Sequence, residues 1–190
     1  MISSSLPGSE HIDVVLVDEK DQPLGTAEKL YAHQKGFLHR AFSVFLYNEK
    51  GQLLIQRRAL GKYHSPGLWA NTCCGHPYVD ESNRDAAVRR VKEELCVDVR
   101  LQPKGHVRYA LTLTPTLYER EFTYLFEGFL PESTFINPNP QEILETAWCP
   151  PEDIRRDARK NPHLYARWFR LYLLKYYDRV FNSPPQALLP

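Results

Sequence analysis

The stretch that decides the fold class is residues 75–97, GHPYVDESNRDAAVRRVKEELCV, in the middle of this 190-residue chain. Ser82 and Asp85 have the spacing of a capping box, in which side chains satisfy free N–H groups of the first helical turn. An apolar stripe follows at the three- to four-residue spacing of a helix: Val88, Val91 and Leu95. The stretch therefore predicts an amphipathic helix over 82–95.

Strands are predicted on both sides of this helix. They are His11–Val17, Arg40–Tyr47, Gln52–Arg57, His106–Thr112, Tyr118–Phe129 and Leu144–Cys149. Turns or breaks are expected at Asp21–Gly25, Asn48–Gly51 and Ser65–Trp69, and a loop at Pro131–Pro140. A helix should start at Pro150–Asp153. A last helix is predicted over Leu164–Phe181, ended by Ser183–Pro185, with one face formed by Tyr165, Trp168, Tyr172, Leu173 and Tyr176. This order indicates an α/β (α+β) sandwich.

The composition excludes several protein classes. Lys and Arg number 24 against 23 for Asp and Glu, so the net charge of +1 lacks the general basic footprint of a nucleic-acid-binding protein. The chain contains no apolar run of about 18 residues, and its opening residues lack a charged segment followed by an apolar one, so we expect no secretory signal. Four cysteines, two of them adjacent, do not form a disulfide framework, so we expect a cytoplasmic protein. We expect one domain over 11–182, a disordered segment 1–10 and a tail 183–190.

Five residues are candidate metal ligands: His33, His39, His76, Glu119 and Glu121. The two glutamates are two residues apart in a predicted strand, so their carboxylates share one face. Such a pair is unfavourable unless it shares a cation or a proton. Imidazoles combined with carboxylates suit Mn, Fe or Zn. The alternative is that the histidines are ordinary hydrogen-bonded residues and that the two glutamates lie on an exposed strand edge.

Two further groups of residues could carry chemistry. In an extended Cys74-Gly75-His76 segment, the cysteine and histidine face the same side, and a nearby cation would favour the thiolate. A buried, inert cysteine is the alternative. The second group is a scattered basic set that could form a diphosphate pocket or could simply be solvated: Lys29, Arg57, Arg58, Lys62 and Arg90.

The central stretch resembles the Nudix signature. Six positions match: Gly75, Glu81, Arg89, Glu93, Glu94 and Val97. Arg90 replaces a signature glutamate that helps Nudix hydrolases hold magnesium, and Cys96 replaces the last glycine. The arginine argues against hydrolytic chemistry and adds a guanidinium that fits phosphate oxygens.

Further motifs resemble type I isopentenyl-diphosphate Δ-isomerases over most of the chain, from about Val14 to Trp168. They are residues 69–77 (WANTCCGHP), residues 57–60 (RRAL), Tyr109, and residues 118–121 (YERE). The resemblance implies a Nudix-like α/β/α sandwich with a mixed sheet and additional terminal helices. It also implies an enzyme that interconverts isopentenyl diphosphate and dimethylallyl diphosphate by moving protons.

The resemblance assigns roles residue by residue. The implied metal ligands are His33, His39, His76, Glu119 and Glu121, with Mn, Mg or Zn as the ion. Glu94 is implied as a ligand of a second ion, magnesium, which bridges the substrate diphosphate. The implied catalytic residues are Cys74, Glu121, Tyr109 and Trp168. The implied diphosphate-binding residues are Lys29, Arg58, Lys62 and Arg90. No role follows for Cys73.

Two other functions stay open at this point. One is a Nudix hydrolase of a nucleoside or isoprenoid diphosphate, and the other is a metal- or nucleotide-binding module without catalysis. Arg90 counts against the first and the intact set of candidate catalytic residues against the second. The expected partner is a small isoprenoid diphosphate, with neither nucleic acid nor membrane, and we expect a monomer or weak dimer.

Overall fold

The computed structural model describes residues 12–182, so the expectations for 1–10 and 183–190, and for Ser183–Pro185, lie outside the described residues. The described strands are β1 Asp13–Val17, β2 Pro23–Glu28, β3 His39–Tyr47, β4 Leu53–Arg58, β5 Trp69–Ala70, β6 Cys73–Gly75, β7 Leu101–Thr114, β8 Leu117–Phe129 and β9 Ile143–Cys149. The helices are α1 Lys29–Lys35, α2 Asn83–Leu95, α3 Pro151–Lys160, α4 Arg167–Leu174 and α5 Tyr177–Phe181, with a 3₁₀ turn at Pro162–Leu164.

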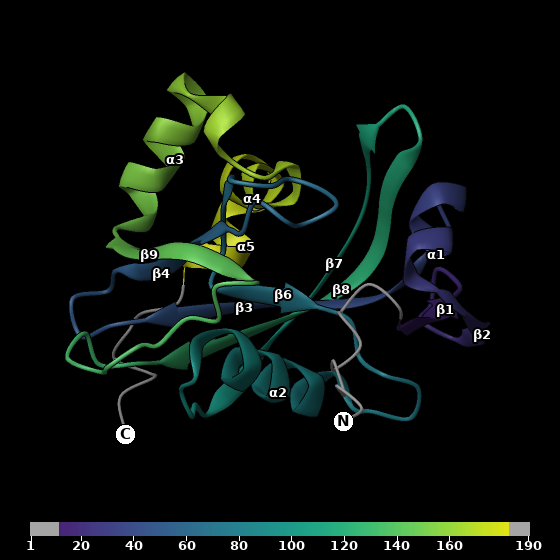
Figure 1. Cartoon of the computed structure of the whole chain (residues 1–190), viewed down its shortest axis with the longest axis horizontal. Coiled ribbons are helices and arrows are strands. Elements are labelled where there is room, and N and C mark those ends of the chain that lie inside the picture. The colour runs from purple at the N-terminus through teal and green to yellow at the C-terminus, as the bar shows by residue number, and fades with distance from the viewer. Residues whose placement is uncertain (1–11, 183–190) are drawn as a thin grey trace, which may run out of the picture.

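The strands form one mixed sheet around β3 (Figure 1). β3 pairs in parallel with β8, whereas its pairings with β1, β4 and β6 are antiparallel. β8 continues into the long antiparallel β7–β8 hairpin, and β9 extends the other side by pairing with β4. The expected mixed sheet is confirmed.

Helices cover both faces of this sheet (Figure 1). Phe42, Val44 and Leu46 of β3 belong to the buried cluster that includes α2. Phe45 and Tyr47 point the other way, into the cluster formed with α3, α4 and α5. Successive side chains of a strand face opposite sides, so one apolar strand supplies both cores. The α/β/α sandwich is therefore present as expected.

The helix predicted over 82–95 is present as α2. Ser82 is the N-cap of α2, and its hydroxyl accepts a hydrogen bond from the Asp85 backbone N–H at 3.1 Å. Val91 and Leu95 are fully buried. The helix ends at Cys96, which has a left-handed backbone with φ 59° and donates its N–H to the Lys92 carbonyl. This left-handed conformation explains why the Nudix signature has glycine at that position.

Several expected boundaries were wrong. The first turn lies at 18–22 instead of 21–25, because the Asp18 carboxylate accepts the N–H groups of Lys20 and Gln22, and residues 23–25 belong to β2. The strands expected at 106–112 and 144–149 begin earlier, at Leu101 and Ile143. Sequence analysis also missed α1, which has only seven residues and is capped by the side chain of Glu28.

The single helix expected over 164–181 is replaced by the 3₁₀ turn, α4 and α5. Tyr165 is extended and forms a β-bridge with Trp69, whose carbonyl accepts the Ala166 N–H at 2.9 Å. The second break, at Lys175 and Tyr176, allows α5 to bury Tyr177, Val180 and Phe181 in the same core as α4. Tertiary contacts therefore outweigh the helical periodicity of this segment.

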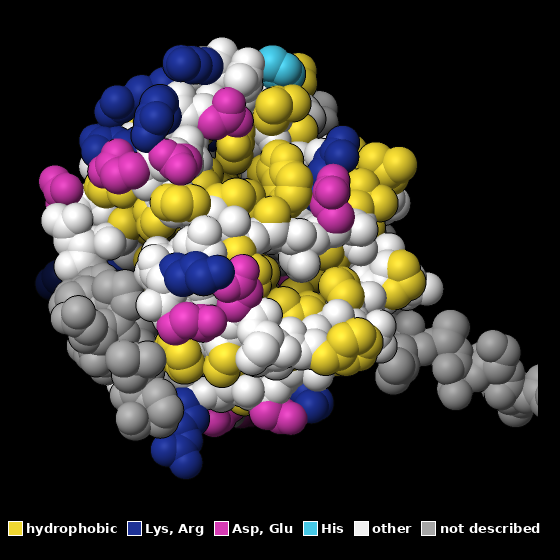
Figure 2. Space-filling model, turned by 90° about the vertical axis from the view of Figure 1, so that its left-hand side faces the viewer, with side chains coloured by type: hydrophobic (Ala, Val, Ile, Leu, Met, Phe, Trp, Pro, Cys, Tyr) yellow, Lys and Arg dark blue, Asp and Glu magenta, His cyan; other side chains and the backbone are white. Residues whose placement is uncertain are grey.

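The surface around α3 and β9 is mixed in charge. Figure 2 shows Lys and Arg side chains beside Asp and Glu on this face, and the ion pairs Arg156–Asp153 (2.7 Å) and Arg155–Glu152 (3.6 Å) lie on α3. The face therefore has no continuous basic surface. Within residues 12–182, no helix has the length and apolar character required to span a bilayer.

Candidate active site

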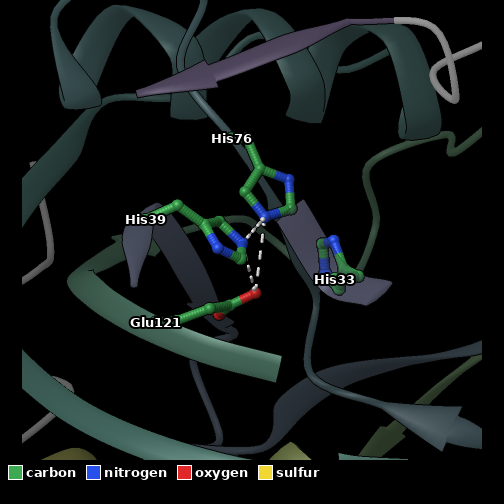
Figure 3. Close-up of side chains that lie close together, drawn as sticks. All are labelled: His33, His39, His76 and Glu121. Carbon is green, nitrogen blue, oxygen red and sulfur yellow. Dashed lines mark hydrogen bonds and ion pairs between the residues drawn. The ribbon is translucent and has the colours of Figure 1, made fainter. Parts of the chain in front are cut away.

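Four of the predicted metal ligands come together at one end of the sheet (Figure 3). His33, His39, His76 and Glu121 each offer a ligand atom, and these atoms all lie within 4.8 Å of one another. They come from α1, the start of β3, the residue after β6, and β8. The parallel register of β3 and β8 places His39 directly opposite Glu121, so the sheet itself builds half of the cluster.

Backbone hydrogen bonds set the orientation of two imidazoles. His33 Nδ1 lies 2.7 Å from the Lys29 carbonyl oxygen, and His39 Nδ1 lies 2.8 Å from that of Phe37. In the tautomers that these contacts favour, Nδ1–H donates and the Nε2 lone pair is free, as in metal-ligating histidines. His33 Nε2 is buried without a hydrogen-bond partner among the described residues.

The cluster lacks a positive charge of its own. His39 Nε2 and His76 Nε2 lie 3.2 Å apart, and Glu121 Oε1 lies 3.8 and 3.3 Å from them. Burial lowers the pKa of His33 to about 4 and that of His76 to about 3, so both are neutral at pH 7. Neutral imidazoles around a buried carboxylate fit a divalent cation, and this donor set suits Mn, Fe or Zn.

Glu121 is also the acceptor of two hydrogen bonds from its other oxygen. Tyr109 donates its phenol O–H to Oε2 at 2.6 Å, and Thr123 donates its hydroxyl to the same oxygen at 3.2 Å. Burial alone would raise the pKa of Glu121, but the hydrogen bond and electrostatic interaction with His76, the interaction with His39 and the Tyr109 hydrogen bond hold it below its usual value. Glu121 is thus a carboxylate linked directly to a phenol.

Glu119 is the predicted ligand that lies outside the four-residue cluster. It is buried on the same face as Glu121, so the exposed-edge alternative is wrong. Its Oε1 lies 3.8 Å from His64 Nδ1, and its Oε2 has no hydrogen-bond partner among residues 12–182. Burial, followed by repulsion from Glu121, raises the pKa of Glu119 well above its usual value.

Cys74 and Trp168 line the same pocket as Glu121 and Tyr109. Trp168 is almost fully buried, and its indole N–H donates to Asn71 Oδ1 at 3.1 Å. Burial raises the pKa of the Cys74 thiol to about 12, which exceeds the opposing influence of the nearby Arg58 charge. The neighbouring Arg58 charge favours the thiolate, as expected, but burial of the thiol outweighs it.

Four of the five expected basic residues line the same pocket: Lys29, Arg58, Lys62 and Arg90. Lys62 and Arg90 share Glu142 and form its cationic end, whereas Arg58 lies over the Trp168 ring at 5.2 Å. Arg57 is excluded, because its side chain turns outward to the Gly67 carbonyl and to Glu145. Burial, reinforced by the three other cations, lowers the pKa of Lys29 to about 8. The pocket therefore concentrates positive charge that suits a diphosphate.

Carboxylates partly neutralise these cations. Glu142 Oε2 accepts from Lys62 Nζ at 2.5 Å and lies 3.3 Å from Arg90 Nη2. Arg90 also donates to Glu94 at 2.5 Å and to Glu93 at 2.8 Å. The Arg90–Glu94 contact is a partly buried ion pair, with side-chain exposures of 14% and 5%, so the alternative of a plain surface salt bridge is wrong.

Sequence analysis missed two residues that line the pocket, Glu142 and His64, and one that contacts the lining residue Glu94, Gln56. Gln56 donates its amide to Glu94 Oε2 at 2.9 Å, Glu142 neutralises two of the cations, and His64 faces Glu119. Neither Gln56 nor Glu142 belongs to a recognisable motif. His64 follows Lys62 by two residues in the loop after the RRAL motif, and that proximity is the one signal that could have found it.

Comparison with known proteins shows the family of this chain. The NUDIX domain family matches residues 37–171. An isopentenyl-diphosphate Delta-isomerase of Streptomyces griseus is 49% identical over 174 residues, covering 90% of this chain and 86% of that protein. One from Jannaschia is 42% identical over 165 residues, covering 86% and 93%. The chain belongs to the isopentenyl-diphosphate Delta-isomerase family.

This isomerase family lies within the Nudix superfamily, and solved structures share its fold. The protein DR0079 of Deinococcus radiodurans superposes with a TM-score of 0.69 at 21% identity, covering 87% of this chain and 99% of that one. A MutT protein of Methanosarcina mazei gives a TM-score of 0.60 at 22% identity, covering 75% and 94%. Within that fold, Arg90 stands where the Nudix signature has a glutamate.

Proposed function

We propose that this pocket is the active site in which the chain, as an isopentenyl-diphosphate Delta-isomerase, interconverts isopentenyl diphosphate and dimethylallyl diphosphate. The single observation that carries the proposal is the arrangement of one pocket with two different ends. A histidine–carboxylate cluster with Tyr109 and Cys74 lies at one end, Lys62 and Arg90 with their shared Glu142 form the other, and Lys29 and Arg58 add two further cations to the lining. A diphosphate bound to the cations would hold its short hydrocarbon against the cluster.

The reaction requires the addition of one proton and the removal of another. A proton added to the terminal alkene carbon of isopentenyl diphosphate forms a tertiary carbocation. Loss of a proton from the carbon on the other side of the cation leaves the double bond in its new position. We assign these transfers to Cys74 and Glu121, acting on opposite faces of the hydrocarbon. Because the reaction is reversible, each group donates in one direction and accepts in the other.

The protonation of the substrate-free pocket is defined by burial and hydrogen bonding. The Cys74 thiol retains its proton, because its pKa is raised to about 12, and Glu121 is ionised. Tyr109 donates to Glu121 and can pass a proton between that carboxylate and a carbon in the pocket. Cys74 and the Glu121–Tyr109 pair are therefore the two groups of the pocket that we assign to proton exchange with the substrate.

The carbocation needs stabilisation by a group that does not react with it. Trp168 presents an indole in the pocket, and cation–π attraction from a desolvated indole is worth about 2 kcal/mol. The hydrogen bond to Asn71 and the surrounding core fix the position of the ring. The dense packing around the indole also excludes water that would trap the cation.

A divalent cation fits the cluster of His33, His39, His76 and Glu121, and the proposed set also includes Glu119. Such an ion would supply a fixed positive charge beside the Glu121–Tyr109 pair. Glu94 is the proposed ligand of a second ion, magnesium, that accompanies the diphosphate. The four free cysteines agree with a cytoplasmic location, which we propose for the enzyme.

Paired substitutions test the assignment of the two transfer groups. Cys74→Ala and Glu121→Gln should each lower turnover at least about 100-fold, the scale of general acid–base catalysis. Cys73→Ala is the matched control, because Cys73 is fully buried in the core beneath α2 and should affect stability more than turnover. A severe loss in Cys73→Ala together with a mild one in Cys74→Ala would contradict the assignment.

A further inference from the structure

His64 is a histidine with a side chain only 10% exposed, and no motif of the family resemblance assigned it a role. It lies in the 59–68 loop between β4 and β5, which also carries Lys62. The base of the loop is closed by two backbone hydrogen bonds, from Arg58 N–H to the Leu68 carbonyl and from Gly67 N–H to the Arg58 carbonyl, both 3.0 Å. Arg58 also donates from its guanidinium to the His64 carbonyl at 3.3 Å.

These contacts bring the His64 side chain into the pocket, where its ring lies near both Trp168 and His33. Its ring meets Trp168 edge-on at a centroid distance of 5.5 Å and stacks towards His33 at 6.1 Å. Its Nδ1 lies 3.8 Å from Glu119 Oε1. This distance exceeds that of a hydrogen bond, and a movement of about 1 Å would form one.

Each member of this pair has a buried polar atom whose hydrogen-bonding capacity is unmet among the described residues. In the described part of the chain, His64 Nδ1 and Glu119 Oε2 have no hydrogen-bond partner. A buried polar atom without a partner costs about 1–3 kcal/mol, so such atoms usually indicate a ligand or a shared partner. A carboxylate that binds a metal through one oxygen commonly receives a hydrogen bond on the other from a neighbouring side chain.

We propose that His64 is a positioning residue that holds the Glu119 carboxylate for the metal centre by donating a hydrogen bond from Nδ1–H. The inference rests on the proposed function, because it assumes that the His33, His39, His76 and Glu121 cluster binds a divalent ion and that Glu119 completes its ligand set. His64 thereby links the loop that carries Lys62 to the opposite end of the pocket.

Two amide variants of His64 test the proposal, because each replaces a different one of the two imidazole nitrogens. Asn places its amide N–H close to the position of Nδ1, whereas Gln places its amide near Nε2. We therefore compare His64→Ala, His64→Asn and His64→Gln, with His163→Ala as the matched control, since His163 is exposed on the 3₁₀ turn. The probe is Mn²⁺ added to metal-stripped protein without substrate, with free Mn²⁺ measured by electron paramagnetic resonance.

The expected result is selective rescue. His64→Ala and His64→Gln should bind Mn²⁺ about 10- to 100-fold more weakly, the range found when partners of metal ligands are removed. His64→Asn and His163→Ala should stay within about threefold of wild type. At saturating Mn²⁺, the KM for isopentenyl diphosphate should be unchanged in all of them. Far-ultraviolet circular dichroism confirms folding, and the Asn variant keeps the test valid if the Ala variant does not fold.

Three outcomes would overturn the inference. Wild-type Mn²⁺ affinity in His64→Ala would show that Glu119 needs no help from His64. Weakened affinity in the Asn variant equal to that in the Gln variant would exclude donation from Nδ1. A raised KM with unchanged Mn²⁺ affinity would make His64 a substrate contact. In all three, a wild-type enzyme that still binds Mn²⁺ and isomerises its substrate leaves the proposed function intact.

Discussion

The two ends of the pocket differ in how their charges are balanced. At the histidine end, neutral imidazoles and an ionised carboxylate face one another, and His33 Nε2 has no partner among the described residues. At the cationic end, Glu142 neutralises Lys62 and contacts Arg90, while Glu94 pairs with Arg90. One end lacks a charge that a bound cation would supply. The other end has internal partners that an incoming diphosphate must replace.

This difference separates the expected roles of the two ends. The ligand atoms of the histidine end are already close together for an ion, so removal of the ion should lower kcat. The cationic end is already paired, so its substitutions should change how strongly the substrate binds. Each of the following experiments tests one side of this contrast.

The largest effect should follow metal removal, which leaves the histidine end incomplete. Exhaustive chelation should lower turnover more than about 100-fold, because the fixed charge beside Glu121 and Tyr109 is lost. Addition of Mn²⁺ or Mg²⁺ should restore it, with elemental analysis establishing the metal content. Full activity in protein shown to be metal-free would contradict the claim that the histidine end requires an ion for turnover.

Substitution at the cationic end should act on KM. Lys62→Ala removes a charge-assisted hydrogen bond, which is worth about 1.5–3 kcal/mol, and should therefore raise the KM for isopentenyl diphosphate about 10- to 100-fold with a smaller change in kcat. Arg57→Ala is the control, since that arginine points away from the pocket. A fall in kcat with unchanged KM in Lys62→Ala would mean that this end takes part in the chemistry.

The smallest effect concerns the acid stability of the metal-free protein. The pKa values of His33 and His76 are depressed to about 4 and about 3, below the value of about 6.5 in the unfolded chain. Their neutral forms stabilise the fold above about pH 6.5, and this contribution is lost as pH falls through that value towards the folded pKa values. Between pH 7 and 5, the free energy of unfolding should drop by about 1–2 kcal/mol for each imidazole.

Urea denaturation in the presence of a chelator at the two pH values measures this drop. His33→Gln should reduce the pH dependence, whereas His163→Gln should leave it unchanged, because His163 is exposed. An equal free energy of unfolding for the chelated wild-type protein at pH 7 and pH 5 would contradict the claim that the His33 and His76 imidazoles are neutral in the folded protein.

Local signals were sufficient to predict much of the fold. The Ser82 cap and its apolar stripe predicted α2, and the 48–51 turn predicted the β3–β4 hairpin. α1 was missed because its seven residues are too few to show a periodicity. The division of the last helix was missed because the bridge between Trp69 and Tyr165 joins residues far apart in the sequence.

The site was less accessible to local reasoning. Spacing alone gave a weak signal for His33, His39, His76 and Glu121, and the family resemblance united them. The β3–β8 register that joins His39 to Glu121 is a tertiary fact. The contact between His64 and Glu119 depends on a loop in which Ser65 has a left-handed backbone with φ 51°, and no residue pattern encodes it. The raised pKa of Cys74 likewise depends on burial, which follows only from the complete fold.

The most direct test of the central claim distinguishes proton transfer at carbon from attack on phosphorus. Isopentenyl diphosphate is incubated with the enzyme in heavy water and followed by proton and phosphorus NMR in one sample. The account predicts dimethylallyl diphosphate that carries deuterium from solvent on carbon, with its diphosphate intact. Release of monophosphate or orthophosphate without deuterium on carbon would contradict it and would identify a Nudix hydrolase instead.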